Sequence, residues 1–385
     1  MRIADREGMR IAIIGTISSS MVSFRGPLLD ALAAARHQVF AFAIDYDEET
    51  ERAVRVLGAT PVHFKLDRTG TSPLHDARSV LTLTALLRRH RIELMLSYFL
   101  KPVIYGTTAA ALARVRNRFA LLPGLGYAFT GDDLHPRSRR SFRRRLVRSA
   151  IKPMLRATLA LNERVFFYNP DDIEELTALN LLDPRKVERL NGTGVDVESF
   201  SASAPVTHPV SFLLAARLLD EKGIREYADA ARRVKAQCPH VRIVLLGGED
   251  SNPGAIPTRE VRGWVEEGLL EWPGHVSDIR PWLDMSSVYV LPSYREGVPR
   301  STQEAMAKGR PIITTDAPGC RETVREGENG FLVPVWDSEA LADRMMRFVR
   351  EPQYISRMGR VSRRMAEERF DVHAINRRIL EVMGL

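Results

Sequence analysis

Two carboxylates lie close together in the C-terminal half of the chain: Glu296 precedes a glycine and a predicted helix, and Glu304 lies inside that helix. The apolar run over residues 288–291 predicts a strand, and residues 301–308 predict a helix after an intervening turn. Each carboxylate can accept hydrogen bonds from two neighbouring hydroxyls, so the pair could hold a ribose and a hexose. Gly297 has no Cβ and lets backbone N–H groups approach a ligand, and the N-terminus of a helix attracts a diphosphate. This combination is typical of a nucleotide-sugar site at the carboxyl end of a strand.

Two cations follow an earlier predicted strand, over residues 210–216. Arg217 and Lys222 leave the end of that strand just before a helix predicted over residues 224–237. A guanidinium and an ammonium at this place would neutralise a diphosphate and stabilise the charge that grows on it as it leaves. Each spacing is weak by itself, and a solvent-facing Glu304 or a Glu296 that only caps a helix would show the same pattern.

The N-terminal half alternates apolar strand patterns with amphipathic helix patterns, beginning with a strand at residues 10–15 and a helix at residues 24–36. The alternation restarts at residue 210, after a linker-like stretch over residues 199–209. Strands that alternate with helices indicate an α/β fold with doubly wound parallel sheets. Asp45-Tyr46-Asp47 lies among solvated acids after the second strand, and we predict no metal site there.

The stretch EGVPRSTQEAMAKGRPIITTDAPGCRETV resembles the C-terminal motif of retaining glycosyltransferases of the GT-B fold, of the family-4 type that includes capsule and O-antigen enzymes. The resemblance covers nearly the whole chain and is strongest from Leu291 to Pro334. It implies two Rossmann-like doubly wound domains that face each other across a cleft. We expect an acceptor-binding domain over residues 1–200, a nucleotide-sugar-binding domain over 201–368, and a C-terminal helix over 369–385 that crosses back to the first domain.

The resemblance also assigns roles. Arg217, Lys222 and Glu296 are the expected catalytic residues, with the two cations on the diphosphate and Glu296 on the transferred sugar. The expected nucleotide-sugar site comprises these three together with Gly15, Val276, Gly297, Val298, Pro299, Arg300 and Glu304. Backbone groups at Val276 would pair with the base, and Glu304 would hold the ribose. Residues in two loops of the N-terminal half are the expected acceptor contacts: Lys101, Gly124 and Gly126. A plain strand–helix turn at Gly15 and a surface role for Lys101 remain alternatives.

Arginines are concentrated in residues 137–156, RSRRSFRRRLVRSAIKPMLR, with apolar residues at near-helical spacing. A helix with an arginine face and an apolar stripe can lie in the headgroup plane of an anionic membrane. We expect Arg139, Arg140, Arg143 and Arg144 to contact the membrane or a lipid diphosphate. A solvated basic helix is the alternative. Nucleic acid is not an expected partner, because neither interleaved aromatic residues nor an RNA-binding motif accompanies the arginines.

Composition is that of a globular protein with 44% hydrophobic residues, and the net charge of +8 suits an anionic partner. Neither a membrane span of about 20 apolar residues nor a signal peptide is predicted. Two cysteines in 385 residues form no disulfide framework. We therefore expect a cytoplasmic protein bound peripherally to the inner face of the cytoplasmic membrane.

The resemblance implies transfer of a hexose or N-acetylhexosamine from a UDP-sugar, with retention, to a polyprenyl-diphosphate-linked saccharide. No metal or other cofactor is expected. The segments SYFLKPVIYG, NGTGVD and ARLLDEKGIREY are most similar to enzymes that extend such lipid-linked saccharides. One alternative is a GT-B enzyme with a soluble acceptor, or a nucleotide-sugar epimerase. The other is a non-catalytic protein that binds anions or nucleic acid.

Overall fold

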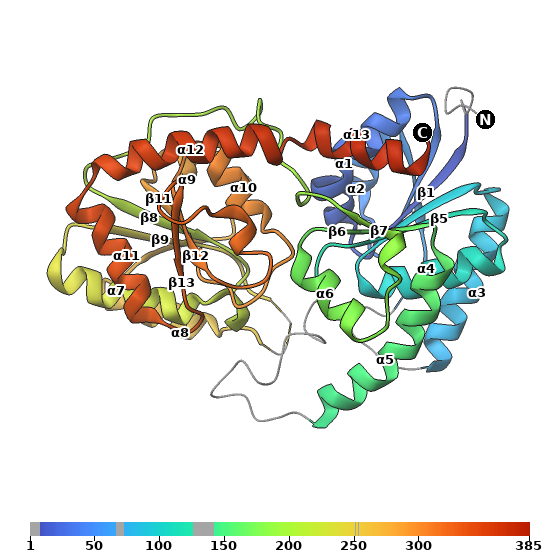
Figure 1. The fold of residues 1–385 in the computed structure, drawn as a ribbon, viewed down its shortest axis with the longest axis horizontal. Helices are drawn as coiled ribbons and strands as arrows, with labels where there is room; N and C mark the ends of the chain where they lie inside the picture. Colours follow the sequence, from blue (N-terminus) through green and yellow to red (C-terminus); the bar gives the residue numbers. More distant parts are fainter. Residues whose placement is uncertain (1–7, 67–72, 126–141, 251, 253) are drawn as a thin grey trace. The chain divides into compact units, whose positions relative to one another are not determined.

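The computed structural model describes residues 8–66, 73–125, 142–250, 252 and 254–385, and it divides into two compact units (Figure 1). The first unit comprises Met1–Thr193 and His373–Leu385, and the second unit comprises Gly194–Val372. The chain therefore passes from the first unit to the second and returns to the first for its last residues.

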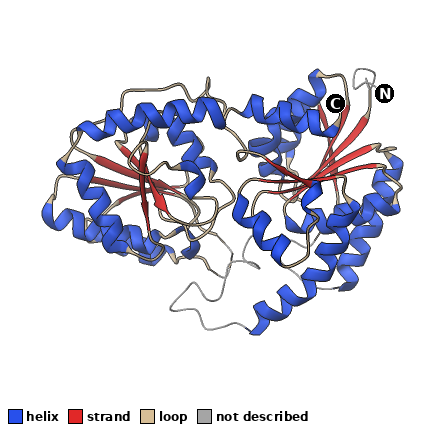
Figure 2. Cartoon of the chain, viewed as in Figure 1, coloured by secondary structure: helices blue, strands red, loops and turns tan. Residues whose placement is uncertain are grey.

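The first unit contains a seven-stranded parallel sheet in the order β3-β2-β1-β4-β5-β6-β7. Its strands are β1 Arg10–Ile14, β2 Gln38–Ala43, β3 Ala59–His63, β4 Leu94–Tyr98, β5 Asn117–Leu122, β6 Arg164–Phe167 and β7 Val187–Arg189. Its helices are α1 Ser18–Ala34, α2 Glu48–Val56, α3 Pro73–Arg89, α4 Leu100–Leu112, α5 Phe142–Leu161, α6 Pro170–Ala178 and α13 Val372–Met383. Helices flank both faces of the sheet, which explains why the central strands are mainly apolar (Figure 2).

The second unit repeats this architecture with a six-stranded parallel sheet in the order β10-β9-β8-β11-β12-β13. Its strands are β8 Ser211–Ala215, β9 Arg242–Leu246, β10 Glu271–Gly274, β11 Val288–Leu291, β12 Ile312–Thr315 and β13 Gly330–Val333. Its helices are α7 Ile224–Gln237, α8 Thr258–Glu266, α9 Arg280–Asp284, α10 Arg300–Ala307, α11 Ser338–Arg350 and α12 Gln353–Arg369. The prediction of an α/β protein with two doubly wound, Rossmann-like sheets is confirmed.

Each sheet reverses its strand order once, between β1 and β4 in the first unit and between β8 and β11 in the second. Loops that leave two parallel strands at such a reversal diverge, and the crevice between them is where open α/β sheets bind ligands. In the second unit, the loop after β8 carries Arg217 and Lys222, and the loop after β11 carries Glu296. The topology therefore places the predicted cations and the first predicted carboxylate at the reversal.

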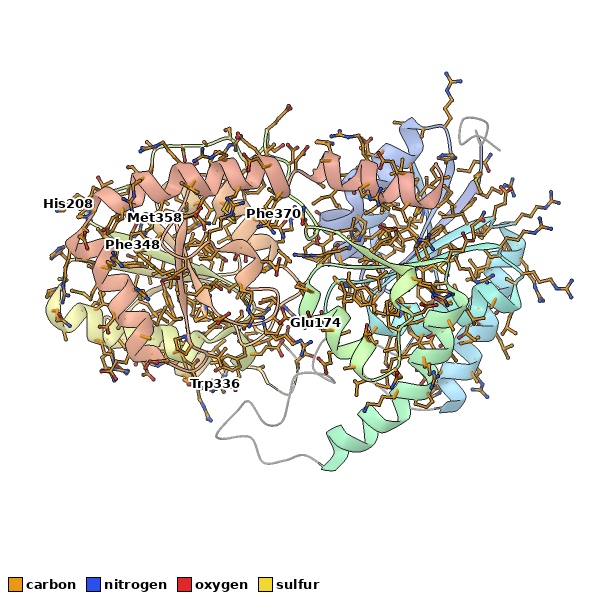
Figure 3. All side chains as sticks on the ribbon, viewed as in Figure 1. Glu174, His208, Trp336, Phe348, Met358 and Phe370 are labelled. Carbon is orange, nitrogen blue, oxygen red and sulfur yellow. The ribbon has the colours of Figure 1, made fainter. Side chains whose placement is uncertain are left out.

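The core of the second unit fixes these loops to a rigid base. All four residues of β11 are buried, and one continuous apolar cluster joins the strands to α7, α8 and α11. Phe348 of α11 and Met358 of α12 belong to this cluster (Figure 3). The side chains that leave the strand ends are therefore carried on elements that packing holds in place.

One predicted helix begins earlier than expected. The helix predicted to begin at Phe24 starts at Ser18, because the serines there act at a helix start instead of in a loop. The Ser18 N–H donates to Asp45 Oδ1 at 2.6 Å, and Ser20 Oγ donates to the Ile17 carbonyl at 2.7 Å. Serine favours both helix starts and turns, so its presence alone could not separate the two.

Candidate active site in the second unit

Lys222 and Glu296 meet directly. Lys222 Nζ forms an ion pair with Glu296 Oε1, and Ser293 Oγ donates to the same oxygen at 2.8 Å. The two charged side chains are 15% and 14% exposed, so they are partly shielded from water yet reachable from outside. Residues 74 positions apart in the sequence therefore form one charged centre at the strand-order reversal.

The loops after β8 and β11 are locked together by backbone contacts. Gly223 has φ +68°, and a Cβ on it would lie 2.1 Å from the Pro292 carbonyl oxygen. The Tyr294 N–H donates to the Glu221 carbonyl at 2.9 Å. Only glycine fits at position 223, because the conformation is left-handed and the opposite backbone occupies the space of a side chain. These contacts hold Lys222 and Glu296 at a fixed spacing.

The backbone of Glu296 is also supported from the segment after β12. The Glu296 N–H donates to the Pro318 carbonyl at 2.9 Å. Gly319 has φ +74°, and a Cβ there would lie 2.2 Å from the carbonyl oxygens of both Glu296 and Gly297. Close backbone approach at Gly319 therefore holds the backbone of residues 296–297 in place. The sequence alone shows only a glycine after a predicted strand at this position.

Glu304 lies within α10 and its side chain is 13% exposed. Arg300, one turn earlier, donates from Nε to Glu304 Oε1 at 2.9 Å. Burial raises the pKa of Glu304; Arg300 opposes this shift, and the charge of Asp278 adds to it. Burial is the main cause of the raised pKa of Tyr289, and the negative charges of Glu304 and Glu296 raise it further. Both carboxylates therefore lie near this tyrosine.

The raised pKa of Glu304 predicts a pH-dependent stability. The folded state holds the Glu304 proton more tightly than the unfolded state, whose carboxyl has the ordinary pKa of 4.5. The free energy of unfolding therefore falls as pH rises from 4.5 through the raised pKa. We expect Glu304→Gln, which has no such proton equilibrium, to gain stability over the parent as pH rises through this window.

Urea unfolding followed by tryptophan fluorescence checks this prediction. All four tryptophans, Trp264, Trp272, Trp282 and Trp336, lie in the second unit, so their emission reports unfolding of that unit. Glu271→Gln is the matched control, because its pairing with Arg242 lowers the pKa of Glu271 and reverses the expected slope. A Glu304→Gln advantage that grew as pH fell would contradict the assignment.

Arg217 is more exposed than Lys222 and pairs with another acid. Its Nη1 donates to Asp250 Oδ2 at 2.7 Å, and its side chain is 53% exposed. Val276 follows β10 in a loop joined to this region, because the Gly247 N–H donates to the Gly274 carbonyl at 2.9 Å. The ends of β8, β9 and β10 thus form one border of the site.

The other residues expected in the nucleotide-sugar site lie at the start of α10. Val298 is 5% exposed and Pro299 precedes the first residue of the helix, Arg300, without a side-chain cap. Gly297 is half-buried beside Glu296. The first turn of α10 therefore begins next to the Lys222–Glu296 pair, and a helix N-terminus at this place could attract an anion.

The candidate residues of the first unit are described separately. Gly15 follows β1, and a Cβ there would lie 2.2 Å from Tyr98 Oη, so its missing side chain makes room for a buried ring. Lys101 lies in the first turn of α4, after Phe99, whose φ of +71° is rare for a residue with a side chain. Gly124 is half-buried in the loop after β5.

Several predicted contacts lie outside the described residues. These are Gly126, Arg139 and Arg140, together with the side chains of Arg143 and Arg144 in α5. Within the described part of the chain, no helix combines the length and the hydropathy needed to cross a membrane.

Asp45 and Asp47 both serve the backbone. Asp45 accepts the Ser18 N–H, and Asp47 Oδ1 accepts the Thr50 N–H at 2.8 Å as the cap of α2. In the described ranges, no three His, Cys, Asp or Glu side chains gather into a set that could hold a metal ion.

Sequence reasoning missed three side chains that the structure brings to the site. Ser293 and Asp250 are hydrogen-bonded to Glu296 and Arg217, and Tyr289 donates to the Ala215 carbonyl between β8 and β11. Ser293 lies in the turn predicted between residues 291 and 301. Its position three residues before Glu296 is the spacing of a side-chain contact across a turn. Asp250 gave no signal, because its partner lies 33 residues away.

Comparisons with known proteins give the class of protein. Residues 209–351 match the family Glycosyl transferases group 1. The chain is 26% identical over 350 residues to the N,N'-diacetylbacillosaminyl-diphospho-undecaprenol alpha-1,3-N-acetylgalactosaminyltransferase of Campylobacter jejuni, covering 88% of each.

Two solved structures show the fold. Sucrose-phosphate synthase from Thermosynechococcus elongatus has a TM-score of 0.78 at 20% identity, over 97% of this chain and 98% of that one. Anabaena Alr3699/HepE in complex with UDP and glucose has a TM-score of 0.72 at 19% identity, over 98% and 99%.

The two parallel sheets and these matches define an enzyme, a glycosyltransferase with the GT-B fold. The prediction of a GT-B glycosyltransferase related to capsule and O-antigen enzymes is therefore confirmed, and the alternative of a non-catalytic anion-binding protein is set aside.

Proposed function

We propose that this glycosyltransferase transfers a hexose or N-acetylhexosamine from a UDP-sugar to a polyprenyl-diphosphate-linked saccharide, with retention at the anomeric carbon. The observation that carries the proposal is the Lys222–Glu296 pair at the strand-order reversal, beside the N-terminus of α10. The pair supplies a cation for a diphosphate and a carboxylate for sugar hydroxyls, and these two groups are hydrogen-bonded to each other.

The proposed roles follow from these contacts. Arg217 and Lys222 hold the diphosphate and neutralise its growing charge, a task for which two cations suffice without a metal. Lys222 uses one of its three N–H donors on Glu296, which leaves two for phosphate oxygens. Glu296 orients the transferred sugar, Glu304 holds the ribose, and the leaving phosphate takes the proton of the acceptor.

The backbone from Gly297 to Arg300 would contact the phosphate and the sugar, and Val276 the base. We assign the acceptor to the first unit, at Lys101, Gly124 and Gly126. The printed name of the Campylobacter relative supports a lipid-linked acceptor, and the HepE complex supports UDP. The basic segment at residues 137–156 and the net charge of +8 support attachment to an anionic membrane on its cytoplasmic face.

A screen of nucleotide sugars by thermal unfolding tests the donor. A ligand that binds only the folded state raises its stability by about 2.7 kcal/mol at 100 times its Kd, so a true donor gives a clear shift in Tm. UDP, GDP and ADP, each free and with glucose or an N-acetylhexosamine, form the panel. The proposal requires the largest shifts from UDP compounds, and no shift from any nucleotide would refute it.

A transfer assay then tests the acceptor and the stereochemistry. The selected UDP-sugar is offered with a polyprenyl-diphosphate-linked saccharide in detergent and with the same saccharide free in water. We expect transfer to the lipid-linked form in the presence of EDTA, with an anomeric configuration equal to that of the donor. Equal transfer to the free saccharide would favour the soluble-acceptor alternative, and isomerisation of the UDP-sugar would favour an epimerase.

A further inference from the structure

The carboxylate of Glu296 is held unequally. Lys222 Nζ and Ser293 Oγ both bond to Oε1, whereas Oε2 has no hydrogen bond from any residue that the structure describes. A carboxylate oxygen offers about two lone-pair sites, so two donors fill Oε1 and leave Oε2 for a ligand. The protein therefore holds one oxygen of the carboxylate, Oε1, and leaves the other, Oε2, for a ligand.

Ser293 is well placed to hold Oε1. Its side chain is fully buried, and its carbonyl accepts Thr315 Oγ1 and, at 3.7 Å, Cys320 Sγ. The preceding Pro292 carbonyl lies against Gly223. Ser293 is thus held between the end of β12 and the segment before α7, and its single hydroxyl proton is committed to Glu296.

Lys222 cannot fix Glu296 by itself during the reaction. In the proposed function the ammonium also binds the diphosphate, whose charge grows as it leaves, and this draws the ammonium away from Glu296. A neutral hydroxyl feels no comparable pull. Its bond to Oε1 therefore persists when the ion pair weakens.

We propose that Ser293 is a positioning residue that keeps Oε2 of Glu296 aimed at the transferred sugar while Lys222 follows the diphosphate. The inference rests on the proposed function and adds the group that makes Glu296 independent of Lys222. It predicts that loss of the Ser293 hydroxyl weakens recognition of the sugar and leaves binding of the nucleotide unchanged.

Three variants test the proposal. Ser293→Ala removes the donor, Ser293→Cys keeps the approximate size but donates weakly, and Ser293→Thr restores a hydroxyl. We expect kcat to fall about 10-fold to 30-fold in the first two, as for loss of one hydrogen bond to a charged group, with the Kd of UDP within about twofold. Ser293→Thr is expected to recover part of kcat, because it restores the hydroxyl.

Ser287→Ala is the matched structural control. Ser287 is also fully buried, and its Oγ accepts the Ser211 N–H at 2.8 Å at the other end of β11. Its loss is expected to lower the unfolding midpoint while kcat per folded molecule stays unchanged. If both alanine variants lost kcat equally at equal folded fractions, Ser293 would be structural only.

A double-mutant cycle gives the decisive readout. If Ser293 acts through Glu296, Ser293→Ala in a Glu296→Gln background lowers kcat by less than about twofold. Binding of UDP and of the best-stabilising UDP-sugar is measured in parallel by calorimetry, so the contribution of the sugar is obtained without turnover. Additive effects, or an unchanged sugar contribution in Ser293→Ala, would overturn this inference alone. A parent that binds no UDP compound would overturn the proposed function and the inference with it.

Discussion

Glu296→Gln is expected to lower kcat by about 10²-fold to 10³-fold while the Kd of UDP changes by less than about threefold, the pattern of a group that acts mainly in the transition state. The amide keeps the shape of the carboxylate but loses the charge that Lys222 and Ser293 now hold at Oε1. In the proposed function that charge orients the sugar and does not contact the nucleotide. Steady-state kinetics and UDP calorimetry on the same preparation measure both quantities.

Glu226→Gln is the control for this change. Glu226 also reaches the loop after β11, where its Oε2 accepts Tyr294 Oη at 2.8 Å, but it belongs to α7 and its recorded partner is this tyrosine instead of Lys222 or Ser293. We expect kcat near that of the parent, since an amide oxygen can accept the same hydrogen bond. If Glu296→Gln weakened UDP binding as much as it lowered kcat, Glu296 would hold the nucleotide and its assigned role would be wrong.

Arg310→Met is expected to destabilise the second unit by about 1–3 kcal/mol, the cost of leaving a buried polar group without its hydrogen-bond partner. Arg310 is fully buried, and it donates to the Leu283 carbonyl at 2.7 Å and to the Ser203 carbonyl at 2.9 Å. Burial lowers the pKa of Arg310 to about 10, so the guanidinium stays charged at neutral pH. Methionine fills similar space but leaves the Ser203 carbonyl without its donor, whereas the Leu283 carbonyl still accepts from the N–H and the hydroxyl of Ser286.

Denaturant unfolding followed by tryptophan fluorescence measures this loss. The control is Arg232→Met on α7, where the guanidinium is 47% exposed and pairs with Asp229 and Glu267. Exposed pairs contribute about 0–1 kcal/mol, so the control is expected to shift the midpoint only slightly. Similar shifts in the two variants would show that the buried network adds nothing beyond surface pairing.

The sequence predicted the part of the site that depends on topology. Alternating strands and helices predict parallel sheets, and parallel sheets bring the loops after β8 and β11 to one edge. The contact between Lys222 and Glu296 follows from this arrangement and from opposite charge. A local sequence pattern alone could not predict this contact, because the two residues are 74 positions apart.

The parts that the sequence did not predict depend on packing between distant segments. Ser293 was assigned to a turn, and only the direction of its side chain shows that it holds Glu296. Gly15 is expected in the donor site, and that role stays a prediction; the structure adds that its missing side chain makes room for the ring of Tyr98 from β4. A glycine signals close approach without identifying what approaches, and only coordinates distinguish a ligand from a ring.

The return of the chain to the first unit has a consequence for synthesis. Val195 and Asp371 pair where the outgoing and returning segments run side by side, and α13 then supplies the buried Ile375, Ile379 and Met383 to the first unit. In topology, the second unit is an insertion within the first. During synthesis the inserted unit can fold before the first unit is complete, because residues 373–385 of the first unit are made last. The order of completion is thus the reverse of the order in which the two units begin.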